Sequence, residues 1–376
     1  MNKAIKYRLY PTEKQKQMFA NTFGCCRKVY NLMLEDKIKS YKETGFFGSQ
    51  TPAMYKKDYP YLKKVDSLAL ANVQLNLQAA INNCFDKTRK KRNAFPNFKS
   101  AKHSRRSYTT NNQHGTVAIT EDSCIKLPKI GKVKAVIHRR PCEDWILKSA
   151  SISQSKDGKY YASVLFEYEA SIPMVAVSDN AIGLDYASDG LYIDDCGSKG
   201  SNHKYYRDSQ KKLAKLQRRL SRKVGSKKGE TKSSNYLKQL NKVNRLHAHI
   251  ANQRQDDLHK LSTEIANRYD VVCAETLNMK AMANKGFGNG KATLDNGYGK
   301  FLTMLEYKLR ERGKYFVKVD KWYPSSQICH CCGTLHPEMK DLSIRTMKCS
   351  CGLVMSRDQN AAINIKKEGL RILKFA

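Results

Sequence analysis

Three acidic residues lie far apart in this chain, and each stands at the boundary of a recognisable secondary-structure pattern. Asp185 follows the apolar residues of segment 181–187, Glu275 ends the apolar run that begins at Val271, and Asp358 opens a helical sequence. Two strand ends and a helix start can meet at one point of a fold. Three converging carboxylates repel one another, and they bind hard cations such as Mg²⁺ through oxygen. The pattern therefore predicts a metal site built where a sheet edge meets a helix N-terminus.

The charge of the chain indicates the partner of this site. The 69 Lys and Arg residues outnumber the 34 Asp and Glu residues, and the net charge is +35. Such a charge destabilises a compact fold through self-repulsion unless a partner neutralises it. Nucleic acid is the natural partner, and its binding should depend strongly on salt. Acids and charge together predict metal-dependent cleavage of nucleic acid, with a generally basic surface as the alternative.

Length and cysteine usage narrow the class of protein. A chain of 376 residues is expected to form two or three domains. Met1-Asn2-Lys3 leads into an alternating strand pattern, so we expect no signal peptide, and no apolar window is long enough for a membrane span. In such a chain the 12 cysteines indicate thiols and metal binding more than disulfides.

The first half of the sequence combines helical and strand patterns. Residues 2–10 alternate as in a strand, and helices are expected at about 13–42 and 66–86. Short strands follow between 107 and 170, among them 117–119, 132–137 and 160–166. The N-terminal strand is expected to join these strands, so that the helical region is an insertion in a β module.

The second half reads as alternating strands and helices. Its expected elements are strands 181–186, 191–194 and 203–206, basic helices 207–223 and 234–267, strand 270–275, strand 314–319 and a last helix from Asp358. This order suits an RNase H-like layer, in which helices cover an open sheet.

The three acids then take distinct roles. In two-metal catalysis one ion activates water and the other stabilises the leaving oxygen. Asp185 would bridge the metals, Glu275 would hold one, and Asp358 would hold the other beside the partial positive charge of its helix N-terminus. Taken singly, an acid at the position of Asp358 is more often a helix cap, and one at the position of Glu275 is usually a solvated side chain. The presence of all three acids in this order is what indicates a two-metal catalytic site.

A second metal site lies between the second and third acids. Two cysteine pairs, each followed by Gly, resemble the knuckles of a zinc ribbon, and four thiolates suit one structural Zn²⁺. The pairs are Cys329 with Cys332, spaced C-x-x-C, and Cys349 with Cys351, spaced C-x-C. Because the second pair is one residue short, Cys331, His330 and His336 are possible substitute ligands.

The chain resembles the TnpB (OrfB) proteins of bacterial insertion sequences, relatives of the type V CRISPR effectors, from end to end. The resemblance includes the helix opening Tyr10-Pro11-Thr12, the segment Pro96-Asn97-Phe98-Lys99 and the surroundings of Asp185 and Glu275. Its most specific mark is the ribbon followed by Arg357-Asp358-Gln359-Asn360-Ala361-Ala362. The chain departs from the family at Tyr186-Ala187, where a Gly is often found.

The resemblance implies an α+β, multidomain RNA-guided DNA endonuclease. A wedge β-barrel is expected at 1–10 and 105–178, with an inserted helical recognition lobe at 11–104. A RuvC-like nuclease is expected at 179–325 and 354–376, with an inserted zinc ribbon at 326–353. The implied cofactors are two catalytic Mg²⁺ ions, or Mn²⁺, and one structural Zn²⁺. A guide RNA from the element's own end would pair with double-stranded target DNA beside a short adjacent motif. The chain would work as a monomer with RNA in the bacterial cytoplasm, at the nucleoid.

Reading of the adjacent motif is expected at one helix and one strand start, where polar side chains suit base edges. The candidates are Tyr55, Ser67, Asn72, Thr110 and Asn111, and ordinary helix-surface or capping roles are the alternative. We expect the basic run 89–92 to contact nucleic-acid backbone. The Gly-rich segment 285–290 is either a lid over the nuclease site or a linker.

Three other functions fit parts of the pattern. An RNA-guided repressor without cleavage would lack some of the acids, and all three are present. A transposase that joins DNA ends would not need the ribbon between its acids. A basic zinc-ribbon RNA-binding protein without enzymatic activity would show no metal-dependent cutting.

Overall fold

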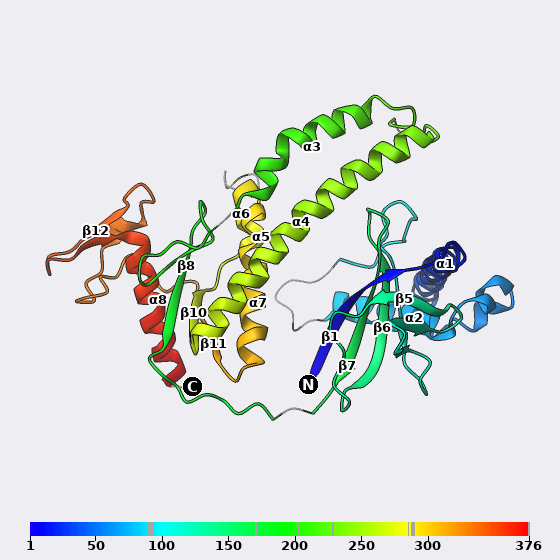
Figure 1. The fold of residues 1–376 in the computed structure, drawn as a ribbon, viewed down its shortest axis with the longest axis horizontal. Helices are drawn as coiled ribbons and strands as arrows, with labels where there is room; N and C mark the ends of the chain where they lie inside the picture. Colours follow the sequence, from blue (N-terminus) through cyan, green and yellow to red (C-terminus); the bar gives the residue numbers. More distant parts are fainter. Residues whose placement is uncertain are drawn as a thin grey trace. The chain divides into compact units, whose positions relative to one another are not determined.

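The computed structural model describes residues 1–86, 88, 94–169, 171–201, 203–227, 229–284, 286 and 290–374. The chain divides into two compact units, Met1–Ala170 and Ser171–Ala376 (Figure 1). The basic run 89–92 lies outside the described residues, as does most of the Gly-rich segment 285–290. In the described part, no helix has the length and apolar character that crossing a bilayer requires.

A seven-stranded antiparallel sheet forms the body of the first unit, in the order β2-β6-β7-β1-β5-β4-β3. The predicted strand at residues 2–10 is confirmed as β1 (Asn2–Tyr10), and its alternate residues Ile5, Tyr7 and Leu9 are buried. The other strands are β2 (Arg106–Asn111), β3 (Ala118–Ile119), β4 (Cys124–Leu127), β5 (Gly131–Val136), β6 (Ile146–Gln154) and β7 (Tyr160–Glu167).

The expectation of a closed β-barrel is wrong for the described residues, because this sheet is open. Its two edges are β2 and β3, which do not pair with each other. β3 has only 2 residues, too few for a ladder that could close the sheet. β2 lies beside α2 (Ser67–Phe85), where the Thr110 hydroxyl donates to Asp66 and the Asn72 amide donates to Asn111 at 3.4 Å.

Two helices pack on this sheet, as the sequence predicts. α1 (Glu13–Thr44) begins at a capping box, in which Thr12 and Gln15 bond each other's backbone N–H groups. Its apolar residues Phe19, Phe23 and Val29 are buried in a core that it shares with α2 and the sheet. Short 3-10 turns at Met54–Lys56 and Pro60–Lys64 join the two helices.

The second unit is built on a four-stranded sheet in the order β11-β10-β8-β9. β8 (Ala181–Tyr186), β10 (Val271–Glu275) and β11 (Tyr315–Val319) are parallel, and β9 (Tyr192–Asp194) is antiparallel. One face packs on α4 (Ser234–Arg268) and α7 (Tyr298–Arg310), and the other on α8 (Arg357–Lys374). The predicted open sheet with helices on its faces is confirmed.

The predicted third strand near 203–206 is wrong, because a helix starts there. α3 (Tyr205–Ser221) begins directly after Lys204, whose φ is 47°. The carboxylate of Asp295 accepts the backbone N–H groups of Tyr206 at 3.2 Å and Arg207 at 3.3 Å. This cap comes from a residue far along the chain, so the local sequence does not reveal it.

The remaining elements extend from this body. α3 pairs with the first part of α4 as a helical hairpin that projects from the sheet (Figure 1), around a core of Leu213, Val243, Leu246 and Ile250. Short helices α5 (Met279–Met282) and α6 (Gly290–Asn296) precede α7. The segment between β11 and α8 contains the two-stranded sheet of β12 (Thr346–Lys348) and β13 (Val354–Ser356).

Two glycines let α8 lie close to the sheet. A Cβ on Gly183 of β8 would meet the Ala362 carbonyl oxygen of α8 at 2.0 Å. A Cβ on Gly369 of α8 would meet Sγ of Cys273, on β10, at 2.3 Å. Because β8 and β10 are neighbours, these two contacts fix both the height and the position of α8 over the strands.

We predict that Gly369→Ala destabilises the second unit although alanine is the better helix former. Overpacking against Cys273 costs about 1–3 kcal/mol, whereas Gly→Ala in an open helix gains about 1 kcal/mol. The control is Gly24→Ala in α1, where a Cβ meets nothing within 4 Å. Denaturant unfolding should show opposite signs for the two variants, and stabilisation by Gly369→Ala would contradict the close contact.

Candidate functional site

Asp185 and Glu275 lie side by side at the carboxyl edge of the second sheet. β8 and β10 are parallel with Leu184 opposite Ala274, so the next residues along the strands are Asp185 and Glu275. Side chains alternate along a strand, so Asp185 shares the face of Gly183 and Glu275 shares the face of Cys273. That face is the one covered by α8, which starts close to this edge.

Asp358 completes the group from the first turn of α8. It lines one cavity of about 710 Å³ together with Asp185 and Glu275. The structure thus brings all three sequence-predicted acids together, and each is half-buried. Arg345 and Arg357 also line this cavity, as does Lys199, which is paired with Asp189 of the same lining.

The acids repel one another in this setting. Burial, followed by the charges of Glu275 and Asp358, raises the pKa of Asp185 well above its ordinary value. Burial also raises the pKa of Glu275, against the opposing effect of the hydrogen bond from the Ser325 hydroxyl. Divalent cations bound by the three carboxylates would relieve both effects, so the donor set fits hard metal ions.

Ser325 is a site residue that the sequence analysis missed. Its hydroxyl donates to Glu275, and its carbonyl accepts the side-chain amide of Asn364 on α8 at 2.8 Å. The same amide donates to the Ile328 carbonyl at 2.6 Å, and Asn360, one turn earlier, donates there at 2.7 Å. Asn360 and Asn364 thus hold the segment 325–328 against α8, and we call these contacts the asparagine clamps. In the sequence, their only signal is that the two asparagines are one helical turn apart.

Asp195 is a second missed residue, and it holds β8 to α8. Its Oδ1 accepts the backbone N–H of Gly183 at 3.1 Å, and its Oδ2 pairs with Lys366 Nζ at 2.8 Å. On the other side of the site, the Asn296 amide donates to the carbonyls of Ala187 and Ser188, each at 3.2 Å. The strand that carries Asp185 is therefore held by side chains at Gly183, in its middle, and just beyond its carboxyl end.

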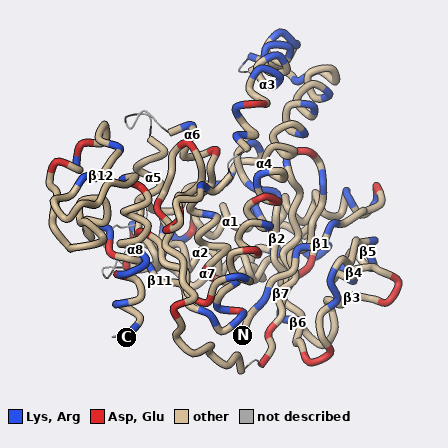
Figure 2. The backbone as a smooth tube through the Cα atoms, turned by 60° about the vertical axis from the view of Figure 1, so that its left-hand side comes forward, with Lys and Arg blue, Asp and Glu red and all other residues tan. Residues whose placement is uncertain are grey.

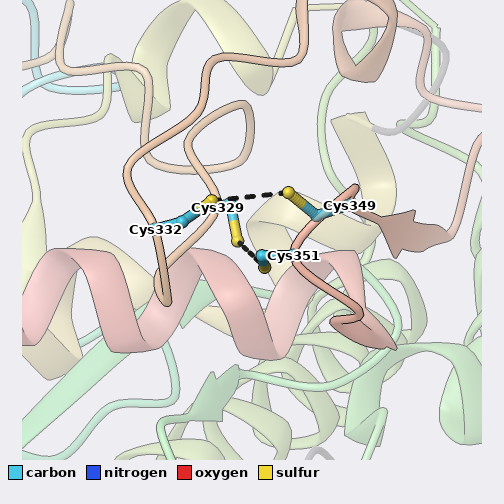
Figure 3. Close-up of side chains that lie close together, drawn as sticks. All are labelled: Cys329, Cys332, Cys349 and Cys351. Carbon is cyan, nitrogen blue, oxygen red and sulfur yellow. Dashed lines mark hydrogen bonds between the residues drawn. The ribbon is translucent and has the colours of Figure 1, made fainter.

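The four predicted zinc cysteines form one group. Figure 3 shows their side chains converging from two loops. All four sulfur atoms lie within 4.8 Å of one another, with 3.7 Å between Cys329 and Cys351 and 3.5 Å between Cys332 and Cys349. Zinc–sulfur bonds of about 2.3 Å in a tetrahedron place sulfur atoms about 3.8 Å apart. The thiols are not disulfide-bonded, and the group fits Zn²⁺.

The three substitute ligands considered for the short knuckle lie outside this group. Cys331 is exposed, and the His330 ring lies 3.2 Å from the Asn360 side-chain oxygen. His336 pairs with Glu338 at 3.0 Å. Hydrogen bonds from the Cys351 backbone N–H and, next in effect, from His336 lower the pKa of Cys349 to about 5. The pKa of Cys351 in the same group is raised to about 12, so without metal these neighbouring thiols share their protons unequally.

Four of the five residues expected to read a DNA motif lie on α2 and β2, and Tyr55 lies in the 3-10 turn Met54–Lys56. Ser67 is exposed and accepts a hydrogen bond from Lys56 at 3.0 Å, while Asn72 and Asn111 are half-buried and contact each other. Thr110 and Tyr55 are buried, and their hydroxyls donate to Asp66 and Asp36. A cavity of about 380 Å³ beside Asn72 is also lined by cationic side chains, namely Arg27, Lys99, Arg105 and Arg106.

The α3–α4 hairpin carries an exposed cationic stripe, visible in blue along α3 in Figure 2. Lys211, Lys215, Arg218 and Arg222 follow one another at helical spacings of four, three and four residues, so they lie on one face. All four are exposed, and none of them forms an ion pair with an acid among the described residues. This stripe, the hairpin stripe, suits a polyanion.

Three family models match separate parts of the chain. Residues 1–45 match a helix-turn-helix domain of the OrfB_IS605 type, where the structure has β1 followed by the single helix α1. Residues 163–286 match the OrfB_IS605 model, described as "Probable transposase", and residues 298–365 match the Cas12f1-like TNB domain.

Whole-length relatives agree with these models. A Streptomyces pristinaespiralis protein, named as an RNA-guided DNA endonuclease, is 33% identical over 384 residues, which cover 98% of this chain and 90% of the relative. The protein InsQ of Escherichia coli strain K12, similarly named, is 30% identical, with coverage of 98% and 93%. A chain of the Cas12f1-sgRNA-target DNA complex shares the fold, with a TM-score of 0.57 at 13% identity and coverage of 97% and 98%. This chain belongs to the TnpB (OrfB) family.

Proposed function

We propose that this protein is an RNA-guided DNA endonuclease that cuts target DNA by two-metal hydrolysis. The observation that carries the proposal is the cavity that Asp185, Glu275 and Asp358 line together. The names of two whole-length relatives support the guide RNA and the DNA target. The Cas12f1 complex, which shares the fold, contains both kinds of nucleic acid.

The residues divide the work by their positions. Two divalent cations, when bound, supply an activated water and stabilise the leaving oxygen. Asp185, between the other two acids in this proposal, would contact both ions, Glu275 would hold one, and Asp358 would hold the other. Arg345, which lines the same cavity, would attract the phosphate backbone. Ser325 would keep the Glu275 carboxylate oriented while its other oxygen binds metal.

The zinc ribbon would act by positioning the chain segment that contacts Glu275. The four cysteines close the zinc site to substrate, which is typical of structural zinc. Ile328, whose carbonyl is clamped by α8, lies next to Cys329, and Ser325 begins the same short segment. Zinc binding would therefore hold the segment that supplies the Glu275 hydrogen bond.

The first unit would contribute recognition. We propose a wedge module at 1–10 and 105–178, a recognition lobe at 11–104, a nuclease at 179–325 and 354–376, and a ribbon at 326–353. Ser67, Asn72 and Asn111 would face the short DNA motif beside the target. Thr110 and Tyr55, whose hydroxyls bond protein carboxylates, would support those residues. Guide RNA would contact the hairpin stripe through its phosphates.

We predict that Asp185→Asn abolishes Mg²⁺-dependent cleavage and also stabilises the metal-free protein. Because the pKa of Asp185 is raised on folding, the charged carboxylate costs stability as the pH rises above its ordinary value of 3.8. At neutral pH the variant should unfold about 2–4 °C higher for each kcal/mol of burial cost and repulsion that the substitution removes.

The measurements are plasmid cutting with co-expressed element RNA, and thermal unfolding without added Mg²⁺ at pH 5 and pH 7, with no chelator, so that the cysteine group keeps its zinc. Asp256→Asn, an exposed acid paired with Lys260, is the control and should cut normally. Full cutting by Asp185→Asn would contradict the proposed function. RNA-guided binding by the wild type without any cutting would indicate a repressor.

We predict that Cys349→Ser releases zinc and lowers cleavage while RNA binding persists. Metal analysis should find about one zinc per chain in the wild type and little in the variant, because a structural site needs its four ligands. Cys331→Ser is the matched control, since this thiol is exposed and lies outside the group of four. Zinc loss from Cys331→Ser instead would assign the short knuckle to Cys331.

We predict that replacing Lys215 and Arg218 with Gln weakens binding of the element RNA and flattens its salt dependence. Each lost phosphate contact should reduce the slope of log K against log salt by about 0.7–0.9. The control replaces Lys260 and Lys318, which are exposed but already paired with Asp256 and Glu306. An unchanged slope in the first variant would remove the hairpin stripe from the RNA interface.

A further inference from the structure

Trp322 is an exposed aromatic residue in the loop that leaves β11 at the catalytic edge of the sheet. Its side chain is 78% exposed, the same fraction as Phe46 and the highest among the large hydrophobic residues described. Isolated exposed hydrophobic residues are common, so exposure alone assigns no role. The hydrogen bonds of the loop around Trp322 and its nearness to the acidic cavity are what indicate a role for this side chain.

The loop holds Trp322 outward in a fixed turn. The backbone N–H of Trp322 donates to the Asp320 carboxylate at 2.8 Å, and the backbone N–H of Tyr323 donates to the Asp320 carbonyl at 3.1 Å. The next ring, Tyr323, packs against the core beneath α8. One ring therefore anchors the loop while its neighbour points to solvent, so ordering Trp322 on binding would cost little entropy.

A cation accompanies the exposed ring. The ammonium of Lys321 lies 4.1 Å from the centroid of the Trp322 ring. Lys321 is itself exposed and has no ion pair with an acid in the described residues. An exposed aromatic ring in contact with a cation that no acid pairs with matches the two parts of a nucleotide, its base and its phosphate.

The loop leads directly into the proposed catalytic site. Ser325, three residues after Trp322, lines the acidic cavity and bonds Glu275. Three residues of chain span at most about 10–11 Å, so the ring lies within a few nucleotides of the carboxylates. A strand whose phosphate occupies the cavity would therefore pass close to this indole.

Base geometry decides which form of nucleic acid this surface accepts. In a duplex the faces of the bases are covered by neighbouring base pairs, so an indole finds only backbone and edges. In an unpaired strand the base faces are free, and stacking on an aromatic side chain accepts every base. The chemistry of Trp322 thus selects single-stranded nucleic acid and is indifferent to its sequence.

We propose that Trp322 is a stacking platform for an unpaired base of the strand that enters the acidic cavity, with Lys321 on the adjacent phosphate. This inference rests on the proposed nuclease function and names the form of its substrate at the site. The platform would hold the strand separated from its complement while its phosphate reaches the carboxylates. It is a binding element, separate from the acids that would carry the chemistry.

The chain offers a direct optical test, because it contains only 2 tryptophans. Trp145→Phe in the full chain leaves Trp322 as the single reporter, and the measurement omits Mg²⁺ and Mn²⁺ so that no cutting occurs while the cysteine group keeps its zinc. Single-stranded DNA of mixed sequence should quench the fluorescence of Trp322. An abasic oligonucleotide of the same length and charge should quench far less, because it has phosphates without bases. Equal quenching by both would overturn the stacking proposal and leave only charge attraction.

Affinity measurements separate the platform from general binding. Trp322→Ala should weaken single-strand binding about tenfold or more, and Trp322→Phe should retain most of it, because stacking needs a ring. Phe46→Ala, at a residue of the first unit with equal exposure, should leave the affinity unchanged. Unchanged affinity in Trp322→Ala would overturn the proposal.

The same variants distinguish failure of the platform from failure of the nuclease function. If Asp185→Asn abolishes cutting and Trp322→Ala changes neither affinity nor cutting, only the platform is wrong. If base-dependent quenching occurs but the wild type cuts no DNA with its RNA, the platform stands as a single-strand binding element and the nuclease proposal fails.

Discussion

The close contact between α8 and the second sheet is the interaction on which the candidate site depends. Gly183 and Gly369 remove the two side-chain atoms that would hold the helix away from β8 and β10. At this separation the first turn of α8 brings Asp358 to the cavity of Asp185 and Glu275. The Asp195–Lys366 pair adds an ionic link between the same two elements. A helix displaced by one methyl group would move a carboxylate relative to its partners, and metal sites tolerate such shifts poorly.

The same helix joins the zinc ribbon to the catalytic edge. Asn360 and Asn364, one turn apart on α8, hold the carbonyls of Ser325 and Ile328. Ser325 then donates its hydroxyl to Glu275. The position of Glu275 therefore depends on three things at once: its strand, the helix and the ribbon segment. This dependence gives a physical reason for a structural metal site between the second and third acids in the sequence.

The sequence could predict the parts of the structure that follow from local patterns. The alternation in β1, the helix start after Thr12 and the apolar run ending at Glu275 each depend on neighbouring residues, and the structure confirms those elements. The third strand failed because α3 is capped by Asp295, from a distant part of the chain. The expected barrel was wrong because closure requires the edge strands β2 and β3 to pair, and the pairing of distant strands cannot be deduced from local sequence patterns. Ser325 and Asp195 escaped notice because their partners lie far away in sequence.

Charge explains why these long-range side-chain contacts are needed. The chain has a large positive excess, yet its candidate site gathers three carboxylates, and burial followed by their mutual repulsion raises the pKa of Asp185. Without a metal, the local repulsion favours separation of the strand end and the helix start. The glycine contacts, the Asp195 link and the asparagine clamps oppose that separation, so the site can stay assembled before metal binds. Part of the folding stability of this unit therefore offsets the repulsion between the carboxylates, as is common at functional sites.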